Sequence, residues 1–112
     1  MRYSTEQLLP ICPVCGYDRL NRPPYNEHGD PSHEICPCCG YEFGHSDSHD
    51  GNTFEEFRSA WLRTRMGKFK WREEQPEGWD ETSRALQMTN TMRVAHYRPR
   101  FILAKHKQKL PD

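Results

Sequence analysis

The chain has 112 residues, enough for one domain, and only 34% of them are hydrophobic, so a self-sufficient apolar core is not expected. Aromatic residues make up 12% of the chain, which argues against a disordered protein, and a cross-link between distant segments would compensate for the small core. The formal net charge is zero, which excludes the overall basic character typical of nucleic-acid-binding domains. No apolar run could span a bilayer and the N-terminus lacks the apolar core of a signal peptide, so we expect a soluble cytoplasmic protein.

Two copies of one turn dominate the first half of the chain. Residues 11–17 read I-C-P-V-C-G-Y and residues 35–41 read I-C-P-C-C-G-Y, and we call these segments knuckle 1 and knuckle 2. In each knuckle a proline fixes φ after the first cysteine, and a glycine after the second permits a positive φ. The segment between them, residues 21–33, is rich in Pro, Gly, Asn and Asp and is predicted to be a surface loop. Tyr41-Glu42-Phe43 alternates as a half-buried strand would.

The paired C-x2-C spacing predicts a metal site. Two residues between cysteines let both sulfurs reach one ion at about 2.3 Å, as tetrahedral coordination requires. We therefore predict one structural Zn²⁺ bound by four cysteines: Cys12, Cys15, Cys36 and Cys39. A reducing compartment disfavours disulfides, whereas iron is an alternative because the turns resemble the knuckles of rubredoxin. Cys38 lies inside its turn and is expected to be a bystander, because no neighbouring base in the sequence would activate its thiol.

The polar loop over residues 44–52 contains two histidines four residues apart. His45 and His49, with Asp47 or Asp50, could form a second metal site. The residues between the histidines are loop formers rather than helix formers, so we expect solvated side chains here.

The sequence predicts two helices. Thr53-Phe54-Glu55-Glu56 has the form of a capping box, and it opens a helix over residues 54–66 that ends at Gly67. The expected inner face of this helix consists of Phe54, Phe57, Ala60 and Trp61. Residues 68–72 alternate charged and aromatic side chains, which favours a short strand. Asp80 can cap a second helix over residues 81–97, whose expected inner face consists of Ala85, Met88, Met92 and Ala95.

These elements predict a small α+β domain over residues 1–98, namely a zinc ribbon of two knuckles on short β-hairpins with two packed helices. Trp61, Trp71 and Trp79 are expected to build the core around the knuckles, with a binding interface as the alternative. Residues 99–112 form a basic C-terminal tail that could bind nucleic acid. Because the chain lacks a phosphate-binding glycine loop, a nucleophile elbow and an H-E-x-x-H motif, we do not expect an enzyme.

The run over residues 34–44, E-I-C-P-C-C-G-Y-E-F-G, resembles the signature of the bacterial cysteine-rich CPCC family. The similarity continues through T-F-E-E-F-R at residues 53–58 and Trp61, and more loosely to Pro76, Gly78 and Trp79, so that it covers about residues 10–90. The resemblance implies a small bacterial metal-binding protein and makes Cys38 part of the motif. Some members of the family resemble immunity proteins that neutralise toxins.

The function we expect is therefore non-catalytic binding of another protein, most concretely a bacterial toxin. Residues 41–82 hold ten carboxylates against six Lys and Arg, which would suit a basic partner such as a nuclease. A nucleic-acid-binding regulator that uses the basic tail is the alternative, and a rubredoxin-like iron electron carrier is a further one. No membrane partner is expected.

Overall fold

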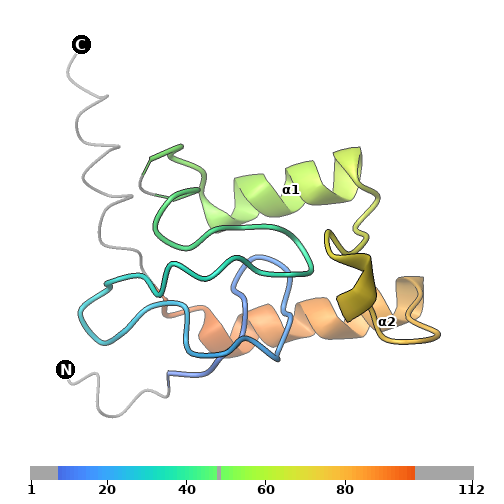
Figure 1. Ribbon diagram of the computed structural model, residues 1–112, viewed down its shortest axis with the longest axis horizontal. Coiled ribbons are helices and arrows are strands. Elements are labelled where there is room, and N and C mark those ends of the chain that lie inside the picture. The colour runs from blue at the N-terminus through green and yellow to red at the C-terminus, as the bar shows by residue number, and fades with distance from the viewer. Residues whose placement is uncertain (1–7, 48, 98–112) are drawn as a thin grey trace.

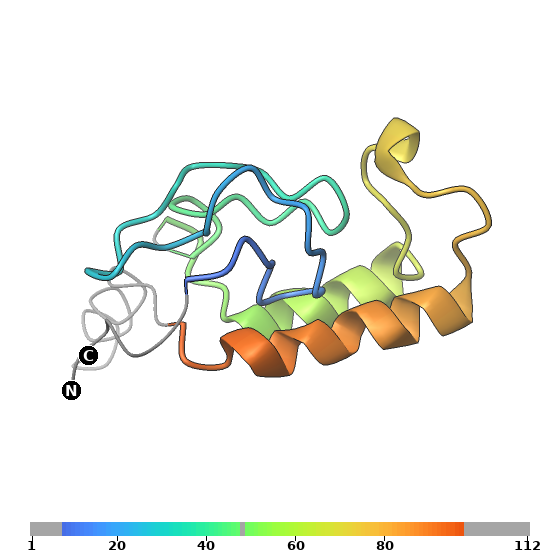
Figure 2. The ribbon, with the colours of Figure 1, turned by 90° about the horizontal axis from the view of Figure 1, so that it is seen from below.

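Two helical segments cover one side of a core built from loops (Figure 1). The structure is a computed structural model that describes residues 8–47 and 49–97 of the chain. Its helical elements are α1 (Phe54–Thr64), the 3-10 helix η2 (Arg72–Glu74), α2 (Glu81–Met88) and the 3-10 helix η3 (Thr89–Val94). Figure 2 shows α1 and the continuous α2–η3 segment side by side, running in opposite directions. The knuckle segments lie together on one side of this helical pair. None of these helices combines the length and apolar character that crossing a membrane requires.

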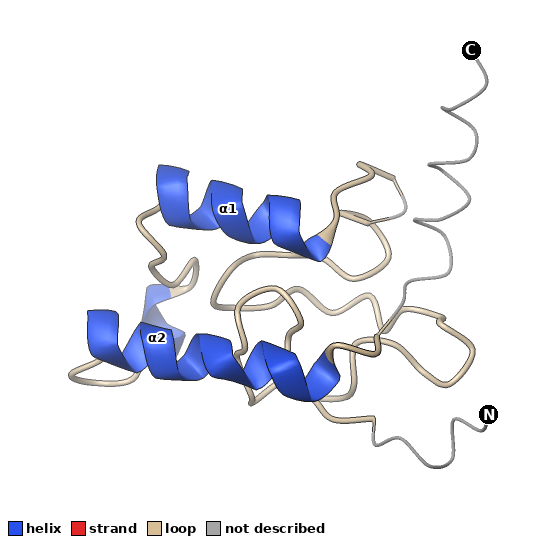
Figure 3. Ribbon diagram, turned by 180° about the vertical axis from the view of Figure 1, so that it is seen from behind, coloured by secondary structure: helices blue, strands red, loops and turns tan. Residues whose placement is uncertain are grey.

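The predicted β-hairpins are not found among the described residues, which contain no β-strand (Figure 3). Among the described residues, pairing consists of two isolated antiparallel bridges, Ile35 with Glu42 and Tyr25 with Pro31. Each knuckle is closed by its own backbone hydrogen bonds, and its flanks are joined by one more, from Leu20 to the Pro10 carbonyl or from Phe43 to the Glu34 carbonyl, which is too little pairing for a strand. The described residues therefore form a small fold of two α-helices around a cysteine cluster, without the β-hairpins of the predicted zinc ribbon.

Helix α1 begins as predicted. Thr53 accepts a hydrogen bond from the Glu56 N–H at 3.1 Å, and the Glu56 carboxylate accepts one from the Thr53 N–H at 3.1 Å, which completes the capping box. On its inner face Trp61 is 2% exposed, and Phe54 and Phe57 pack against the core. The helix stops where Met66 and Gly67 both adopt a positive φ, at 56° and 62°.

The α-helix predicted over residues 81–97 ends early, at Met88, and most of its expected inner face is exposed. Asp80 caps it as expected, accepting from the Ser83 N–H at 3.0 Å, but the α-helix tightens into a 3-10 helix at Thr89. Of the expected inner face only Met88 packs against the core; the others, Ala85, Met92 and Ala95, are exposed. The apolar residues that this segment buries are Val94 and, just beyond it, Tyr97. The predicted inner face is therefore correct for Met88 and wrong for the other three residues.

Aromatic side chains form most of the core around the knuckles. Tyr41 and Phe43 are fully buried, and the Tyr25 ring meets the Phe43 ring edge to face at 5.7 Å. Trp79 is half-buried and packs edge to face on Phe69, as the prediction of a tryptophan-lined core required. Trp71 contradicts that prediction, because it is 38% exposed.

The strand predicted over residues 68–72 is also absent. The N–H groups of Lys70 and Trp71 donate to the Cys38 and Pro37 carbonyls at 2.8 and 3.0 Å, so this segment pairs with knuckle 2 instead of forming a strand. The domain boundary predicted after residue 98 and the basic tail lie outside the described residues.

Candidate metal centre

Four cysteine sulfurs from the two knuckles converge at one point in the core. Each offers its Sγ within 4.8 Å of the other three, and all four side chains are buried; they are Cys12, Cys15, Cys36 and Cys39. The Cys12 and Cys39 sulfurs are 3.7 Å apart, and so are those of Cys15 and Cys36. A tetrahedral zinc ion with Zn–S bonds of about 2.3 Å requires sulfurs separated by about 3.8 Å. The donor set therefore fits one tetrahedral metal ion. These are the four cysteines that the sequence spacing indicated as metal ligands.

The two knuckles reach this geometry by the same backbone hydrogen bonds. In knuckle 1 the Cys12 N–H donates to the Tyr17 carbonyl at 2.8 Å, and the Gly16 N–H donates to the Cys12 carbonyl at 2.8 Å. In knuckle 2 the equivalent bonds, from Cys36 to Tyr41 and from Gly40 to Cys36, are 3.0 and 2.9 Å long. Both glycines have φ near +86°, a conformation that other residues rarely adopt. The repeated sequence is thus a repeated structure.

The thiols of the cluster influence one another strongly. Burial raises the pKa of Cys12, and it raises the pKa values of Cys15 and Cys39 well above the ordinary value. Burial also acts to raise the pKa of Cys36, but hydrogen bonds from the other three cysteines and from the Cys39 N–H hold that pKa well below its ordinary value. One thiolate is thus stabilised by three neighbouring thiols. A divalent cation bound among the sulfurs would stabilise all four thiolates.

The outward carbonyls of the two turns are satisfied by different donors at equivalent positions. In knuckle 1 the Pro13 and Val14 carbonyls accept from the Arg58 guanidinium of α1, at 2.9 and 2.6 Å. In knuckle 2 the Pro37 and Cys38 carbonyls accept the two backbone N–H groups of residues 70 and 71. A guanidinium holds its N–H groups in a fixed fork, so one arginine can do for knuckle 1 what two amides do for knuckle 2.

Helices α2 and η3 contact knuckle 1 through polar side chains that the sequence analysis did not identify as contact residues. Gln87 donates to the Cys15 carbonyl at 3.2 Å, and Asn90 donates to the Gly16 carbonyl at 3.0 Å. The backbone approach is equally close, since a Cβ added to Gly16 would lie 1.9 Å from the Gln87 carbonyl oxygen. The available signal was a pair of amide side chains, three residues apart, inside a helix with apolar neighbours.

Cys38 lies apart from the four-sulfur cluster. It occupies the position that Val14 holds in knuckle 1, and both side chains are fully buried. Its Sγ lies 3.3 Å from the Gln87 Nε2. The structure thus places Cys38 as a packing residue at the junction with α2, in agreement with the expectation that it is a bystander.

The two histidines of the 44–52 loop lie against each other on one turn. The His49 N–H donates to the His45 carbonyl at 2.9 Å, which is the hydrogen bond of a helical turn, and the two imidazoles stack at 4.6 Å. The expectation of solvated side chains is confirmed, since the His45 and His49 side chains are 49% and 73% exposed, and the turn also stacks the two rings. Asp50 contacts both rings, whereas Asp47 is buried and binds the Tyr25 hydroxyl and the Gly44 N–H.

Comparison with family models, with curated proteins and with solved structures found no match to this chain. The resemblance to the CPCC family therefore rests on the motif residues themselves. What the chain does has to be argued from the cysteine cluster, the helices that hold it and the surface that they leave exposed.

Proposed function

We propose that this chain is a non-catalytic module whose fold is held together by one structural zinc ion and which binds another protein. The zinc part is supported by the four-cysteine cluster, in which every coordination position of a tetrahedral ion would be filled by a buried sulfur. Catalytic zinc sites instead keep one position for water or substrate. A closed, buried site stabilises a fold, so the function belongs to the surface around it.

The observation that carries the protein-binding part is that α2 and η3 turn polar side chains toward knuckle 1 and leave apolar ones at the surface. Gln87 and Asn90 turn their amides inward to the knuckle carbonyls, while Leu86 and Met92 are 67% and 77% exposed. Two large apolar side chains directed to solvent on one short helical segment are costly to hydrate. Single exposed apolar residues are common, whereas apolar residues that adjoin a groove mark a surface for a protein partner.

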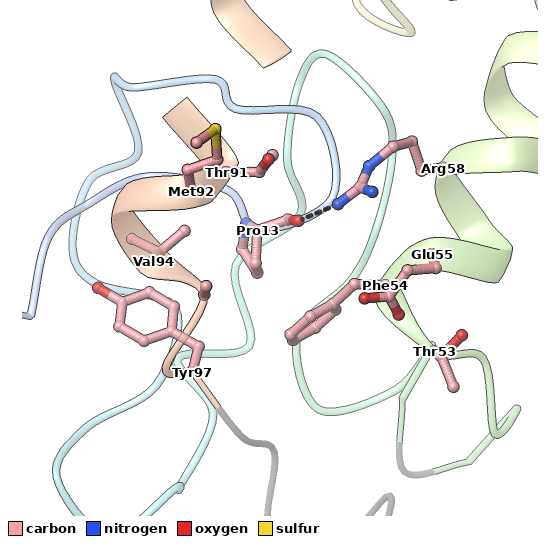
Figure 4. Close-up of a pocket in the computed structure, with 10 residues that line it drawn as sticks. Pro13, Thr53, Phe54, Glu55, Arg58, Thr91, Met92, Val94 and Tyr97 are labelled. Atoms are coloured by element: carbon pink, nitrogen blue, oxygen red, sulfur yellow. Dashed lines mark hydrogen bonds between the residues drawn. The ribbon is translucent and has the colours of Figure 1, made fainter. Parts of the chain in front are cut away.

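A groove runs beside Met92, between α1 and η3 (Figure 4). It has a volume of about 370 Å³ and Pro13 of knuckle 1 forms part of its lining. Phe54 of α1 faces Val94 and Tyr97 across the groove, and Met92 lies on its η3 side. An apolar groove between two helices accepts an apolar side chain or a short helix of a partner.

The most concrete partner is a bacterial toxin, which the chain would neutralise as an immunity protein. This form of the proposal is supported by the CPCC resemblance and by charge. The chain has a formal net charge of zero, but residues 41–82 hold ten carboxylates against six Lys and Arg, and four metal-bound thiolates around a divalent ion add two negative charges. An acidic surface speeds association with a basic partner such as a nuclease.

The test uses the folded, zinc-loaded protein and matched surface variants. A partner is captured from the native cell and purified. It should bind the Leu86→Ser and Met92→Ser variants at least tenfold more weakly than the wild type, and it should bind Met66→Ser as tightly as the wild type. Met66 is the control because it is 59% exposed and lines a different hollow, to which neither Leu86 nor Met92 contributes. If no purified partner shows this pattern, and co-expression protects cells against no toxin, the protein-binding proposal fails.

The metal is identified separately. Elemental analysis should find one zinc per chain and a colourless protein, whereas a red protein that absorbs visible light would show the iron centre of a rubredoxin-like carrier. Cys36→Ser should lose the ion and unfold the domain. Cys38→Ser should keep it.

A nucleic-acid-binding regulator is the second candidate, and one observation favours it. Residues 58–72 contain six Lys and Arg and no acidic residue, and five of these cations are exposed. Together with the basic tail they could follow a phosphate backbone. Salt-sensitive binding to RNA or DNA that disappears on removal of residues 99–112 would support this function over protein binding.

A further inference from the structure

A second group of possible metal ligands lies on the surface, away from the cysteines. It consists of His45, His49 and Asp50, whose donor atoms all lie within 4.8 Å of one another. The side chains are 49%, 73% and 44% exposed, so solvent and dissolved ions reach them directly. The function proposed above does not use this group.

The backbone brings the two imidazoles to the same side of a turn. The His45 carbonyl accepts from the His49 N–H at 2.9 Å and from the Asp50 N–H at 3.0 Å. Residues four apart in a helical turn share one face, and here the rings stack with their planes 10° apart. The Asp50 carboxylate joins them, with Oδ1 2.9 Å from the His49 Nδ1 and Oδ2 3.7 Å from the His45 Nε2.

The turn that carries these side chains is anchored in the core. Asp47 is 1% exposed, accepts from the Gly44 N–H at 3.0 Å and also from the Tyr25 hydroxyl, and its carbonyl accepts from the Gly51 N–H at 3.1 Å. The Asn52 N–H donates to the Ser46 carbonyl at 3.0 Å. A fixed backbone lowers the entropic cost of bringing three ligands to one ion.

We propose that His45, His49 and Asp50 bind one divalent transition-metal ion, with solvent completing its coordination. Ligand atoms about 2.1 Å from a tetrahedral ion lie about 3.4 Å from one another, so the donor atoms are close enough, and the exposed rings rotate out of their stack to aim their nitrogens at one ion. Imidazole with one carboxylate suits Zn²⁺, Ni²⁺ or Cu²⁺, whereas Mg²⁺ and Ca²⁺ prefer oxygen ligands alone. Residues 42–57 contain five acidic residues and no Lys or Arg, so the local charge attracts cations.

This site differs from the cysteine cluster in accessibility and in ligand number. The cysteine cluster is buried and supplies four ligands, whereas the surface group supplies three and leaves coordination positions open. An ion held here exchanges with solvent and can accept a donor atom from a bound molecule. The proposal stands independently of the protein-binding function.

The test titrates Zn²⁺ into protein that already contains one zinc per chain, by calorimetry and by elemental analysis after desalting. We expect one additional equivalent of zinc. Its affinity should fall at least tenfold in His45→Ala and in His49→Ala and should not change in His28→Ala. His28 is the matched control, because it is exposed beside the Glu27 carboxylate at 3.6 Å, and its contact is with that carboxylate rather than with a second imidazole.

Two further measurements exclude indirect effects. The cysteine-bound zinc and the near-ultraviolet circular dichroism should be the same in all variants, since the three substituted side chains are exposed. Added Zn²⁺ should shift the imidazole proton resonances of His45 and His49 but not that of His28, and millimolar Mg²⁺ should shift none of them. Binding of a single zinc per chain at saturation, or a second equivalent that survives in a double variant lacking both histidines, would overturn the proposal.

Discussion

The contact between α2 and knuckle 1 makes the two knuckle glycines a matched pair for mutation. Gly16 and Gly40 occupy equivalent positions and have φ of 86° and 87°. An alanine at either position is strained because an L side chain disfavours positive φ, which costs about 1–2 kcal/mol. The surroundings differ. A Cβ on Gly16 would lie 1.9 Å from the Gln87 backbone oxygen, whereas a Cβ on Gly40 would meet the Lys70 Cδ at 2.8 Å.

The difference in surroundings sets the difference in stability. The Lys70 side chain is flexible and exposed, so it can move aside in Gly40→Ala, and only the backbone strain remains. In Gly16→Ala the obstacle is helix backbone, which has to shift and would break the Gln87 and Asn90 hydrogen bonds to the knuckle. Overpacking of this kind costs about 1–3 kcal/mol beyond the strain. We therefore expect a loss of about 1–2 kcal/mol for Gly40→Ala and about 2–5 kcal/mol for Gly16→Ala.

Urea denaturation of the zinc-loaded proteins, followed by far-ultraviolet circular dichroism, measures both losses. Zinc release to a competing chelator is the second readout, and it should be faster in Gly16→Ala because knuckle 1 loses its support from α2. Equal free energies of unfolding for the two variants would refute the reasoning, since backbone strain alone would then explain both. A larger loss in Gly40→Ala would show that α2 does not press on knuckle 1.

Three other substitutions test separate contacts. Arg58→Met removes both side-chain hydrogen bonds to the knuckle 1 carbonyls and should lower the free energy of unfolding by about 2–4 kcal/mol, while the exposed Arg63→Met should change it by less than about 0.5 kcal/mol in the same urea titration. Cys38→Val, which copies the residue of knuckle 1, should change stability by less than about 1.5 kcal/mol and leave one ion per chain by elemental analysis; loss of the ion would show that Cys38 is a ligand. Tyr25→Phe removes a hydrogen bond to the buried Asp47 carboxylate and should cost about 1.5–3 kcal/mol, measured as a lower urea midpoint, and an unchanged midpoint would contradict the importance of this bond.

The local parts of the structure could be predicted because their residues determine their own geometry. A proline after one cysteine and a glycine after the next produce the same turn in both knuckles, whatever surrounds them. The Thr53 and Glu56 pair caps α1 through bonds within four residues. These features need no tertiary partner, so the sequence pattern was sufficient.

The orientation of α2 could not be predicted from its apolar period. A period shows that a helix has two different sides, and the apolar side is usually buried. Here two knuckle carbonyls that need donors lie on the inner side of α2 and η3, so Gln87 and Asn90 face inward while Leu86 and Met92 face solvent. The buried pair of Tyr25 and Asp47 was missed for a similar reason, because it joins two polar loops that each looked solvated.

The metal centre and the proposed binding surface are parts of one arrangement. The carbonyls that orient α2 belong to knuckle 1, and their positions depend on the cysteines on either side of them. Without a metal, the buried thiols would have little to hold the two knuckles together, and α2 would lose the acceptors that direct its amides inward. We expect the domain to unfold in that case, as predicted for Cys36→Ser, and the surface that carries Leu86 and Met92 to be lost with it. Partner binding should therefore be lost together with the ion.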